Sequence, residues 1–567
     1  MQVNKLFRRQ DEQSVILRVQ WSSRCAIAIC ALINSWICRF QMNPDGVSYL
    51  DMGDLYWKRN WHSALNTYWS PLYGWLTGLM FLVTKPTMRW EYPEVHLLNF
   101  VIFIAALFCF EFFWRELLAS KGAEAWAGGA RTYAWVLGYL LFAYVHFVVH
   151  SLALVTPDLL VAALVYLATG MMLGFARERI GATSAFLLGV LLGIGYLTKA
   201  AMLPFAFVFM MTMLALAWRR HLRKSLVAAT FLGCLLICLP FIAALSWNAH
   251  QFTWGESAKL NQGWLVNNVR PPYRHWQGDR PGHEDALHPT RRVFDSPDVY
   301  EFATPILGTY PVWYAPAYWY AGLDSSMHPV REPQVILKNM KIILIWLFLE
   351  PPFLVTFVLL LLMSQRIKVF GRNLMTFWPI LAPVVAVFLI YMMVSWEGRY
   401  TSGVMLVLWG VMTVSTSIPG GGRLLKRFWA VSLLLVVMVV YQFSSVLIMN
   451  YRSFGNSEQS VIVAEHLWSM GIERGDQIAL IGDGFSEEFW ARLGKVRIVA
   501  EVPHGTGFEI TNPTAEFWNS TPGIKQTVLD ILKRTGAKAV IADTPPTTLP
   551  PGWVPVGNTG HAIYFFR

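Results

Sequence analysis

Residues 225–247 read SLVAATFLGCLLICLPFIAALSW, a run with no charged side chain that begins directly after Arg223 and Lys224. A helix needs about 20 mostly apolar residues to cross the hydrocarbon core of a bilayer. The run therefore predicts a transmembrane helix, and the two cations at its start mark that end as cytoplasmic. This stretch alone places the chain among integral membrane proteins.

Similar apolar runs recur along the chain and predict eleven transmembrane helices. They lie near 22–41, 94–113, 132–150, 158–176, 183–198, 200–218, 225–247, 338–362, 374–394, 401–419 and 428–449. In this topology the short connectors rich in Lys and Arg all fall on one side, which the positive-inside rule makes cytoplasmic. The apolar segment 71–83 is too short to span a bilayer, so we interpret it as an interfacial or re-entrant helix.

The composition agrees with this class. Of 567 residues, 55% are hydrophobic and 14% charged, against roughly 45–50% and 25% in soluble domains. The net charge of +11 belongs to the membrane part, so we expect a lipid bilayer and no nucleic acid as partner. The six cysteines lie in apolar runs without a CxxC pair, which argues against a zinc ribbon or disulfide framework. No cofactor is predicted; a divalent metal is left open but nothing indicates one.

The predicted fold is a polytopic α-helical membrane protein with a small extracytoplasmic α/β domain at its C-terminal end. Residues 1–450 form the transmembrane domain, which includes an external loop at 41–92 and a long external loop at 248–335. The long loop is rich in Trp and Tyr and is expected to lie along the membrane surface. Residues 455–567 alternate between predicted helices and strands, which is typical of an α/β domain.

Four polar clusters fall on the external side. They are Asn43–Asp54, Thr156–Asp158, Leu197–Lys199 and Ser395–Tyr400. Each has an ordinary explanation, because Asp45 and Asp158 can cap helices, Lys199 can snorkel, and Arg399 can pair with Glu397. Together, however, they bring two carboxylates and two cations to one external surface. Carboxylates suit deprotonation of a hydroxyl, and Lys and Arg suit phosphate oxygens, so the inventory fits transfer from a phosphate-activated donor.

The order and side of these motifs resemble the GT-C superfamily of integral membrane glycosyltransferases. The motifs are NPDGVSY at 43–49, YWSPLYGW at 68–75, TPD at 156–158, GYLTK at 195–199 and EGRY at 397–400. The bacterial branch with the lipid A aminoarabinose transferase and the protein O-mannosyltransferases is the most similar, over residues 1 to about 420. The chain departs from the aminoarabinose transferases at Ser48, where they carry Arg, and at Trp69-Ser70, where they carry Glu-Lys. A different sugar or acceptor is therefore expected.

The resemblance also implies roles for single residues. Asp45 would be the catalytic carboxylate and Asp158 a second catalytic acid, while Lys199 and Arg399 would hold the donor phosphate. Tyr49, Asp51, Glu397 and Tyr400 are the predicted substrate contacts, and no metal ligands are predicted.

The implied reaction is inverting transfer of a monosaccharide from a polyprenyl-phosphate donor to an extracytoplasmic glycan, lipid or protein. The implied location is the bacterial cytoplasmic membrane, with the N-terminus cytoplasmic and the C-terminal domain periplasmic or extracellular. A transporter or flippase for lipid-linked sugars is the first alternative; it would predict internal repeats and charges at mid-bilayer. A non-catalytic membrane subunit of a glycan assembly complex is the second.

Overall fold

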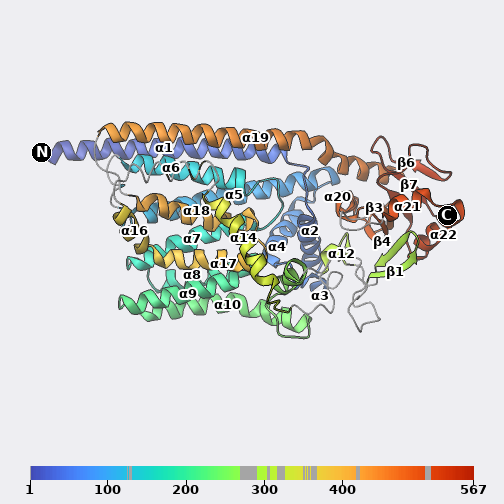
Figure 1. Ribbon diagram of the computed structural model, residues 1–567, viewed down its shortest axis with the longest axis horizontal. Coiled ribbons are helices and arrows are strands. Elements are labelled where there is room, and N and C mark those ends of the chain that lie inside the picture. The colour runs from blue at the N-terminus through green and yellow to red at the C-terminus, as the bar shows by residue number, and fades with distance from the viewer. Residues whose placement is uncertain are drawn as a thin grey trace.

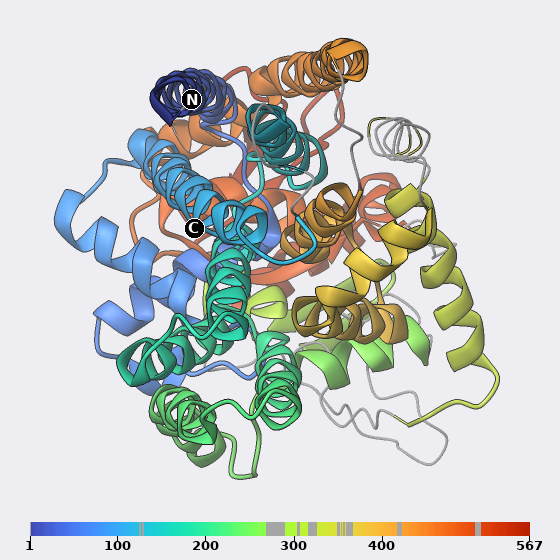
Figure 2. The same ribbon diagram turned by 90° about the vertical axis from the view of Figure 1, so that its left-hand side faces the viewer.

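The computed structural model describes residues 2–123, 126, 130–267, 290–302, 307–315, 326–348, 352, 354, 358, 367–416, 422–504 and 512–566. Long helices run side by side in a bundle, and a sheet domain lies at one end of it (Figure 1). The N-terminus lies at the opposite end of the bundle from the C-terminus, which belongs to the sheet domain. Figure 2 looks along the bundle, with α1 at its upper edge and α10 at its lower edge.

A helix occupies each of the eleven predicted spans. These are α1 (Gln2–Ile37), α5 (Met88–Leu118), α6 (Ala130–Tyr144) continued by the π-helix η2 (Val145–Val149), α7 (Asp158–Ala176), α8 (Ala182–Thr198), α9 (Met202–Arg219), α10 (Lys224–Asn248), α14 (Arg331–Phe348), α17 (Trp378–Val394), α18 (Gly398–Ser415) and α19 (Gly422–Ser469). Most of the predicted span 338–362 beyond Phe348 lies outside the described residues.

The predicted count of eleven is nevertheless not confirmed. Within the described residues, seven helices are long and apolar enough to cross a membrane. Helix α16 (Ile367–Thr376) and α17 meet at a bend of 84° and make eight if they form one span. Helix α8 has 17 residues, and α14 carries Lys338 and Lys341 within its length. The chain is thus a multi-pass membrane protein, and its described residues hold fewer clearly apolar spans than the eleven that the sequence predicts.

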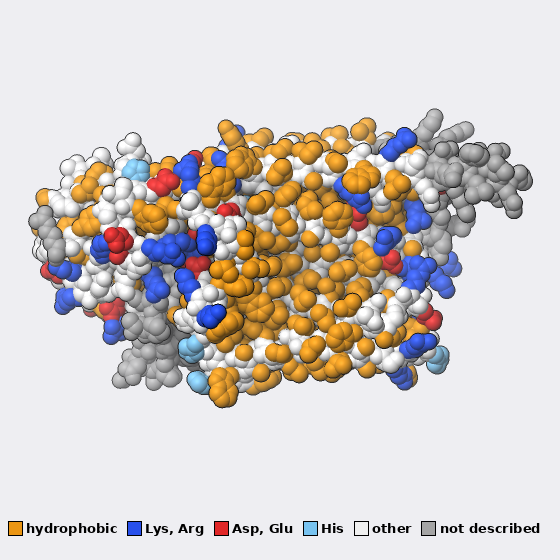
Figure 3. All heavy atoms as spheres, turned by 180° about the vertical axis from the view of Figure 1, so that it is seen from behind, with side chains coloured by type: hydrophobic (Ala, Val, Ile, Leu, Met, Phe, Trp, Pro, Cys, Tyr) orange, Lys and Arg blue, Asp and Glu red, His pale blue; other side chains and the backbone are white. Residues whose placement is uncertain are grey.

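The outer surface of the bundle is apolar. Figure 3 shows a broad belt of hydrophobic side chains, with Lys, Arg, Asp and Glu gathered toward the two ends. Along α10, for example, Leu232 and Leu236 are 61% and 59% exposed. Apolar area on this scale is costly to expose to water, at about 25 cal/mol per Å², so the belt is the surface that contacts lipid.

Three short helices form a layer between the bundle and the sheet: α2 (Pro44–Trp57), α3 (Trp61–Ala64) and α4 (Pro71–Thr84). Helix α4 is apolar and has 14 residues, too few to span, as the sequence predicts. Helices α2 and α4 touch through glycines, because a Cβ at Gly53 would lie 2.5 Å from the carbonyl oxygen of Gly74. A Cβ at Gly78 would lie 2.8 Å from the carbonyl oxygen of Gly53. This close approach fixes α2 against α4.

The C-terminal sheet has seven strands in the order β1-β2-β4-β3-β5-β7-β6. The strands are β1 (Thr290–Asp295), β2 (Asp298–Phe302), β3 (Gln477–Gly482), β4 (Arg497–Pro503), β5 (Ala539–Ala542), β6 (Trp553–Pro555) and β7 (Ala562–Phe565), with helices α20 (Gly484–Gly494), α21 (Pro513–Asn519) and α22 (Pro522–Arg534) between them. Strands β4, β3 and β5 are parallel, and the apolar faces of all three are buried. The predicted α/β alternation is confirmed in these elements.

Two features of the sheet domain differ from the prediction. Strands β1 and β2 come from the long external loop, and β2 pairs antiparallel with β4 at Tyr300 and Glu501. The sequence predicts that this loop lies along the membrane surface and predicts no strand in it. The sequence also predicts a separate helix near 457–470 at the start of the C-terminal domain; in the structure this stretch is the last part of α19, which continues without a break from the bundle. The bundle and the sheet domain are therefore joined at two places.

Candidate active site

A cavity of about 440 Å³ lies where the bundle meets the external layer and the long loop. Its walls come from residues at the starts of α2, α7, α9 and α18, just before α4, and at the ends of α8 and α17. The short helices α11 (Ser257–Asn261), η3 (Gln262–Val266) and α12 (Pro311–Tyr314) complete them. The volume falls within the roughly 300–1,000 Å³ usual for small-molecule sites. Seven of the eight predicted site residues line it: Asp45, Tyr49, Asp158, Lys199, Glu397, Arg399 and Tyr400.

The two aspartates stand at the first turns of α2 and α7, but neither is the N-cap residue. The N-cap positions are Asn43 and Pro157. Asn43 instead accepts a hydrogen bond at its Oδ1 from the backbone N–H of Val155, at 2.8 Å. This bond ties the loop before α7 to the start of α2, so it holds Asp45 and Asp158 near each other. The capping explanation of these aspartates is therefore wrong.

Arg399 connects three carboxylates. Its Nη2 lies 3.2 Å from Oδ2 of Asp45, and its Nε lies 2.7 Å from Oε2 of Glu397 and 4.0 Å from Oδ2 of Asp158. The pair with Glu397, which the sequence offers as the ordinary explanation, does form. Because the guanidinium fork has several donors in one plane, that pair does not stop Arg399 from contacting Asp45.

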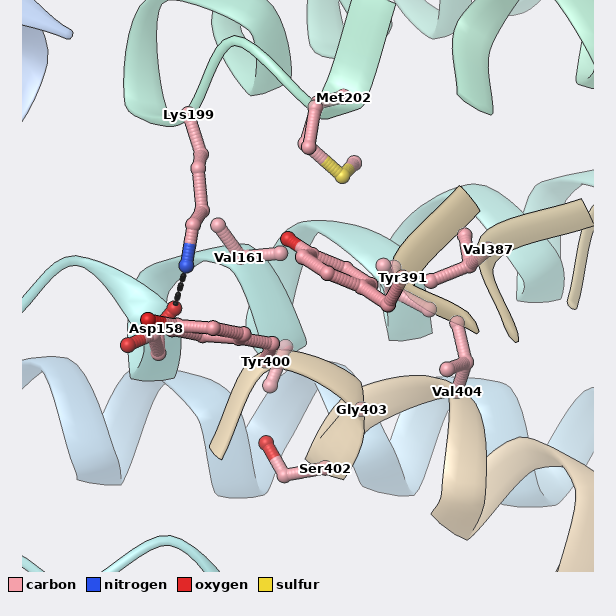
Figure 4. A pocket seen from close by; sticks show the side chains of 13 residues that line it. Asp158, Val161, Lys199, Met202, Val387, Tyr391, Tyr400, Ser402, Gly403 and Val404 are labelled. Carbon is pink, nitrogen blue, oxygen red and sulfur yellow. Dashed lines mark hydrogen bonds and ion pairs between the residues drawn. The ribbon is translucent and has the colours of Figure 1, made fainter. Parts of the chain in front are cut away.

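Lys199 points into the site. Its Nζ lies 2.5 Å from Oδ1 of Asp158 and 3.8 Å from the ring centre of Tyr400, and Figure 4 shows it reaching from the loop after α8 toward both. Tyr391 stacks on Tyr400 with 5.2 Å between ring centres. A cation over aromatic faces is held where water is scarce. Snorkelling away from the protein does not describe this lysine.

Burial shifts the pKa of Asp45. The side chain is 22% exposed. Burial raises the pKa of Asp45 and nearby Asp158 adds to the rise, while Arg399 opposes it; the net direction is upward from the ordinary value. A carboxylate with a raised pKa takes up a proton more readily, as a general base requires.

Aromatic side chains form the rest of the cavity wall. Trp254, Trp264 and Trp313 come from the long loop, and Tyr68 and Trp69 precede α4. Three Trp side chains of the long loop therefore lie in the cavity wall. The wall is braced by two hydrogen bonds to the carbonyl oxygen of Tyr314, from Asn66 Nδ2 at 2.8 Å and from Trp69 Nε1 at 3.2 Å. Tyr49 packs edge-on against the Trp69 ring.

Asp51 is the predicted site residue that the structure places elsewhere. It is buried away from the cavity and accepts hydrogen bonds from the backbone N–H and the hydroxyl of Thr309, at 2.6 and 2.9 Å. It also pairs at 2.7 Å with Arg492 of the sheet domain. Its position in the motif suggested a substrate contact. Asp51 lies six residues after Asp45 on α2, so it is on a different face of the helix, and this face is directed toward the sheet domain.

Sequence reasoning missed several residues of the site. The hydroxyl of Thr156 donates to Asp158 at 3.0 Å, Asn43 was given no role, and Tyr391 was not among the predicted residues. Thr156 and Asn43 sit inside quoted motifs, so their neighbourhood was a usable signal. Tyr391 lies in a predicted span and gave none. Among the described residues no group of three or more His, Cys, Asp or Glu side chains is placed to hold a metal ion.

Comparison with known proteins gives a match in structure and none in sequence. No family model and no curated protein matches the chain. The crystal structure of ArnT from Cupriavidus metallidurans bound to undecaprenyl phosphate aligns with a TM-score of 0.51 at 12% identity, over 95% of this chain and 96% of that one. Its apo state gives a TM-score of 0.48 at 11% identity, over 95% and 97%. The oligosaccharyltransferase of Archaeoglobus fulgidus, with Zn and sulfate, gives 0.47 at 12% identity, over 92% and 68%.

These proteins are GT-C membrane glycosyltransferases. The alignment with undecaprenyl phosphate-bound ArnT extends over nearly the whole of both chains. It includes the C-terminal sheet domain as well as the bundle. The resemblance that the sequence motifs indicate is thus confirmed at the level of structure, and this chain has the fold of the GT-C membrane glycosyltransferase ArnT.

Proposed function

We propose that the chain is a membrane glycosyltransferase that moves a monosaccharide from a polyprenyl-phosphate donor to an extracytoplasmic acceptor, with inversion. One observation carries the proposal. Arg399 and Lys199 bring Asp45 and Asp158 together in the wall of a cavity that is otherwise lined mostly by aromatic and small side chains. The binding of undecaprenyl phosphate to ArnT, a protein of the same fold, supports a lipid phosphate as the donor's leaving group.

In this reaction Asp45 is the base. The acceptor hydroxyl gives its proton to the Asp45 carboxylate while its oxygen attacks the anomeric carbon of the donor sugar. The bond between that carbon and the phosphate oxygen breaks, and both of its electrons leave with the polyprenyl phosphate. One displacement inverts the configuration at the anomeric carbon. Asp158 keeps Lys199 oriented toward the site through their short ion pair.

Lys199 and Arg399 stabilise the negative charge that develops on the leaving phosphate. In the structure Lys199 and Arg399 are paired with carboxylates, so a phosphate has to share or replace one of these partners. Glu397 is 49% exposed, against 22% for Asp45 and 3% for Asp158. A solvated carboxylate costs least to move, so we propose that the donor phosphate takes the place of Glu397 on Arg399.

The same reading gives an orientation. The N-terminal end of the bundle faces the cytoplasm, and the cavity and sheet domain face the periplasm or the cell exterior of a bacterium. The Lys- and Arg-rich connectors at the N-terminal end support this through the positive-inside rule. The acceptor then meets the donor on the outer leaflet.

The direct test is a transfer assay with the full chain in lipid nanodiscs. Undecaprenyl phosphates that carry different radiolabelled hexoses and pentoses are supplied with a membrane or periplasmic extract as the source of acceptor. We expect at least one donor to release undecaprenyl phosphate and pass its label to the extract. Movement of labelled lipid between leaflets without release of the sugar would instead identify a flippase and overturn the proposal.

A further inference from the structure

We propose that Arg492 of the sheet domain is a positioning residue that holds helix α2, and with it Asp45, in place through Asp51. The inference rests on the proposed function and adds a role for the C-terminal domain in catalysis. A positioning residue acts through another side chain; Arg492 itself lies outside the described cavity lining.

Arg492 is the centre of a buried charge cluster. Its side chain is 3% exposed and lies in α20. Its Nη1 lies 2.7 Å from Asp51 Oδ1 and 3.1 Å from Asp54 Oδ2, and its Nε lies 2.7 Å from Oε1 of Glu91 in α5. Lys495 also pairs with Glu91. One guanidinium thus joins the sheet domain, the external helix α2 and a helix of the bundle.

Asp51 links Arg492 to the segment that forms part of the cavity wall. Besides Arg492 it binds Thr309 at both the backbone N–H and the hydroxyl. Thr309 lies two residues before the start of α12, whose Trp313 lines the cavity. On the other side, the ring of Trp313 packs edge-on against Phe485 of α20, with 4.7 Å between ring centres. The wall that carries Trp313 is therefore held by the sheet domain at two points.

Asp51 also connects Arg492 to the helix that carries Asp45. Asp45 and Asp51 lie on α2, and with a rise of about 1.5 Å per residue their positions are roughly 9 Å apart along its axis. A helix of this length moves as one body, so a shift at Asp51 reaches Asp45. The glycine contact between α2 and α4 restricts sliding from the other face. Arg492 thereby selects one orientation of Asp45 relative to Arg399.

The cost of leaving a buried charge unpaired explains why loss of the Arg492 guanidinium should move α2. Loss of one partner from a buried ion pair leaves the other charge without compensation, which is strongly unfavourable. Among the contacts of the described residues, removal of Arg492 would leave Asp51 with Thr309, Glu91 with Lys495, and Asp54 with Lys58 at 3.7 Å. Helix α2 would then shift to solvate its carboxylates. Contacts between domains of one chain usually permit motion, and this buried cluster is one element that opposes it at α2.

The test measures backbone exchange and kinetics in the full chain in nanodiscs. The variants are Arg492→Met and Arg492→Lys, and the control is Lys538→Met, which removes an exposed ion pair with Asp476 in the same domain. For Arg492→Met we expect hydrogen exchange to rise at least tenfold in peptides from α2 and residues 307–315. The transmembrane helices α7 and α8 should keep their protection. Arg492→Lys should give a smaller rise, and the control should give none.

Kinetics distinguish positioning from general loss of fold. We expect Arg492→Met to lower kcat more than tenfold while the KM for the donor changes less than threefold, because Lys199 and Arg399 do not lie on α2. Arg492→Lys should recover part of kcat. Unchanged exchange in α2 would overturn the inference, and so would a loss of protection that extends evenly into α7 and α8. If the chain transfers no sugar, the exchange pattern still tests the coupling, so the two proposals can fail separately.

Discussion

Replacement of Asp45 by Asn tests the assignment of the base. The amide keeps the size of the carboxylate and can still accept a hydrogen bond from Arg399, but it cannot take up the acceptor's proton. General base catalysis contributes about 10²- to 10⁴-fold, which at about 1.36 kcal/mol per tenfold corresponds to roughly 2.7–5.4 kcal/mol of barrier. We therefore expect kcat to fall by at least 100-fold.

The same change should cost little stability. The Asp45 and Arg399 side chains are 22% and 15% exposed and lie 3.2 Å apart, and Arg399 keeps Glu397 at 2.7 Å. A partly solvated pair of this kind contributes about 1 kcal/mol. The thermal midpoint of Asp45→Asn in detergent should thus fall by only a few degrees. The donor should bind with nearly unchanged affinity.

The assay is the rate of undecaprenyl phosphate release under saturating donor, measured beside the matched variant Glu397→Gln. That variant also removes a carboxylate from Arg399, but an exposed one, so we expect its kcat to stay within about tenfold of the parent chain's. Turnover of Asp45→Asn within tenfold of the parent chain would refute the assignment of the base. Equal losses in both variants would mean that Asp45 acts only as a partner of Arg399.

Three further outcomes follow from the site and its surroundings. In a scintillation proximity assay, Lys199→Gln should weaken the binding of undecaprenyl phosphate at least tenfold. Arg399→Lys should weaken this binding less, because a point charge replaces the planar guanidinium. Unchanged affinity in both variants would mean that the phosphate binds elsewhere. A reporter fused to the C-terminus should be active only outside the cytoplasm, and cytoplasmic activity would reverse the topology. Burial raises the pKa of Asp54, but the charges of Arg492, Lys495 and Lys58 outweigh burial and lower this pKa from 3.8 to about 2. The ionised Asp54 therefore stabilises the folded chain by about 2 kcal/mol above pH 3.8, and this stabilisation is lost as the pH falls toward 2. The thermal midpoint of Asp54→Asn should consequently fall less than that of the parent chain between pH 4.5 and pH 2.5, and an equal fall would exclude Asp54 as the cause.

The sequence predicted the bundle well because lipid imposes a simple rule. A span must be apolar for its full length, and the run at 225–247 obeys it closely. The rule was weaker for α14, which carries the exposed Lys338 and Lys341, and for α18, whose polar residues Thr401 and Ser402 are buried. Asp45, Asp158, Lys199 and Arg399 could be brought together from topology alone, since all four follow or precede a span on the same side.

Contacts between distant segments could not be predicted in this way. Residues 290–302 carry an ordinary β-hairpin pattern, yet their membership of the sheet depends on the position of β4, some 200 residues later in the chain. Asp51 was expected in the site because it lies beside Asp45 in the motif. Its true partner, Arg492, looks like any surface arginine on an amphipathic helix. Burial of a charge is decided by what packs over it, which a single sequence does not contain.

The long helix α19 bears on which acceptors can enter. It has 48 residues, or roughly 72 Å at about 1.5 Å per residue, while the hydrocarbon core is about 30 Å thick. More than half of the helix therefore stands outside the lipid, and near its end Trp468 donates to the Gly494 carbonyl oxygen at 3.0 Å. The sheet domain is thus attached to the end of α19 that projects beyond the membrane. We therefore expect the distance between the sheet domain and the bilayer to change little, and under the proposed function this limits how bulky an acceptor can be.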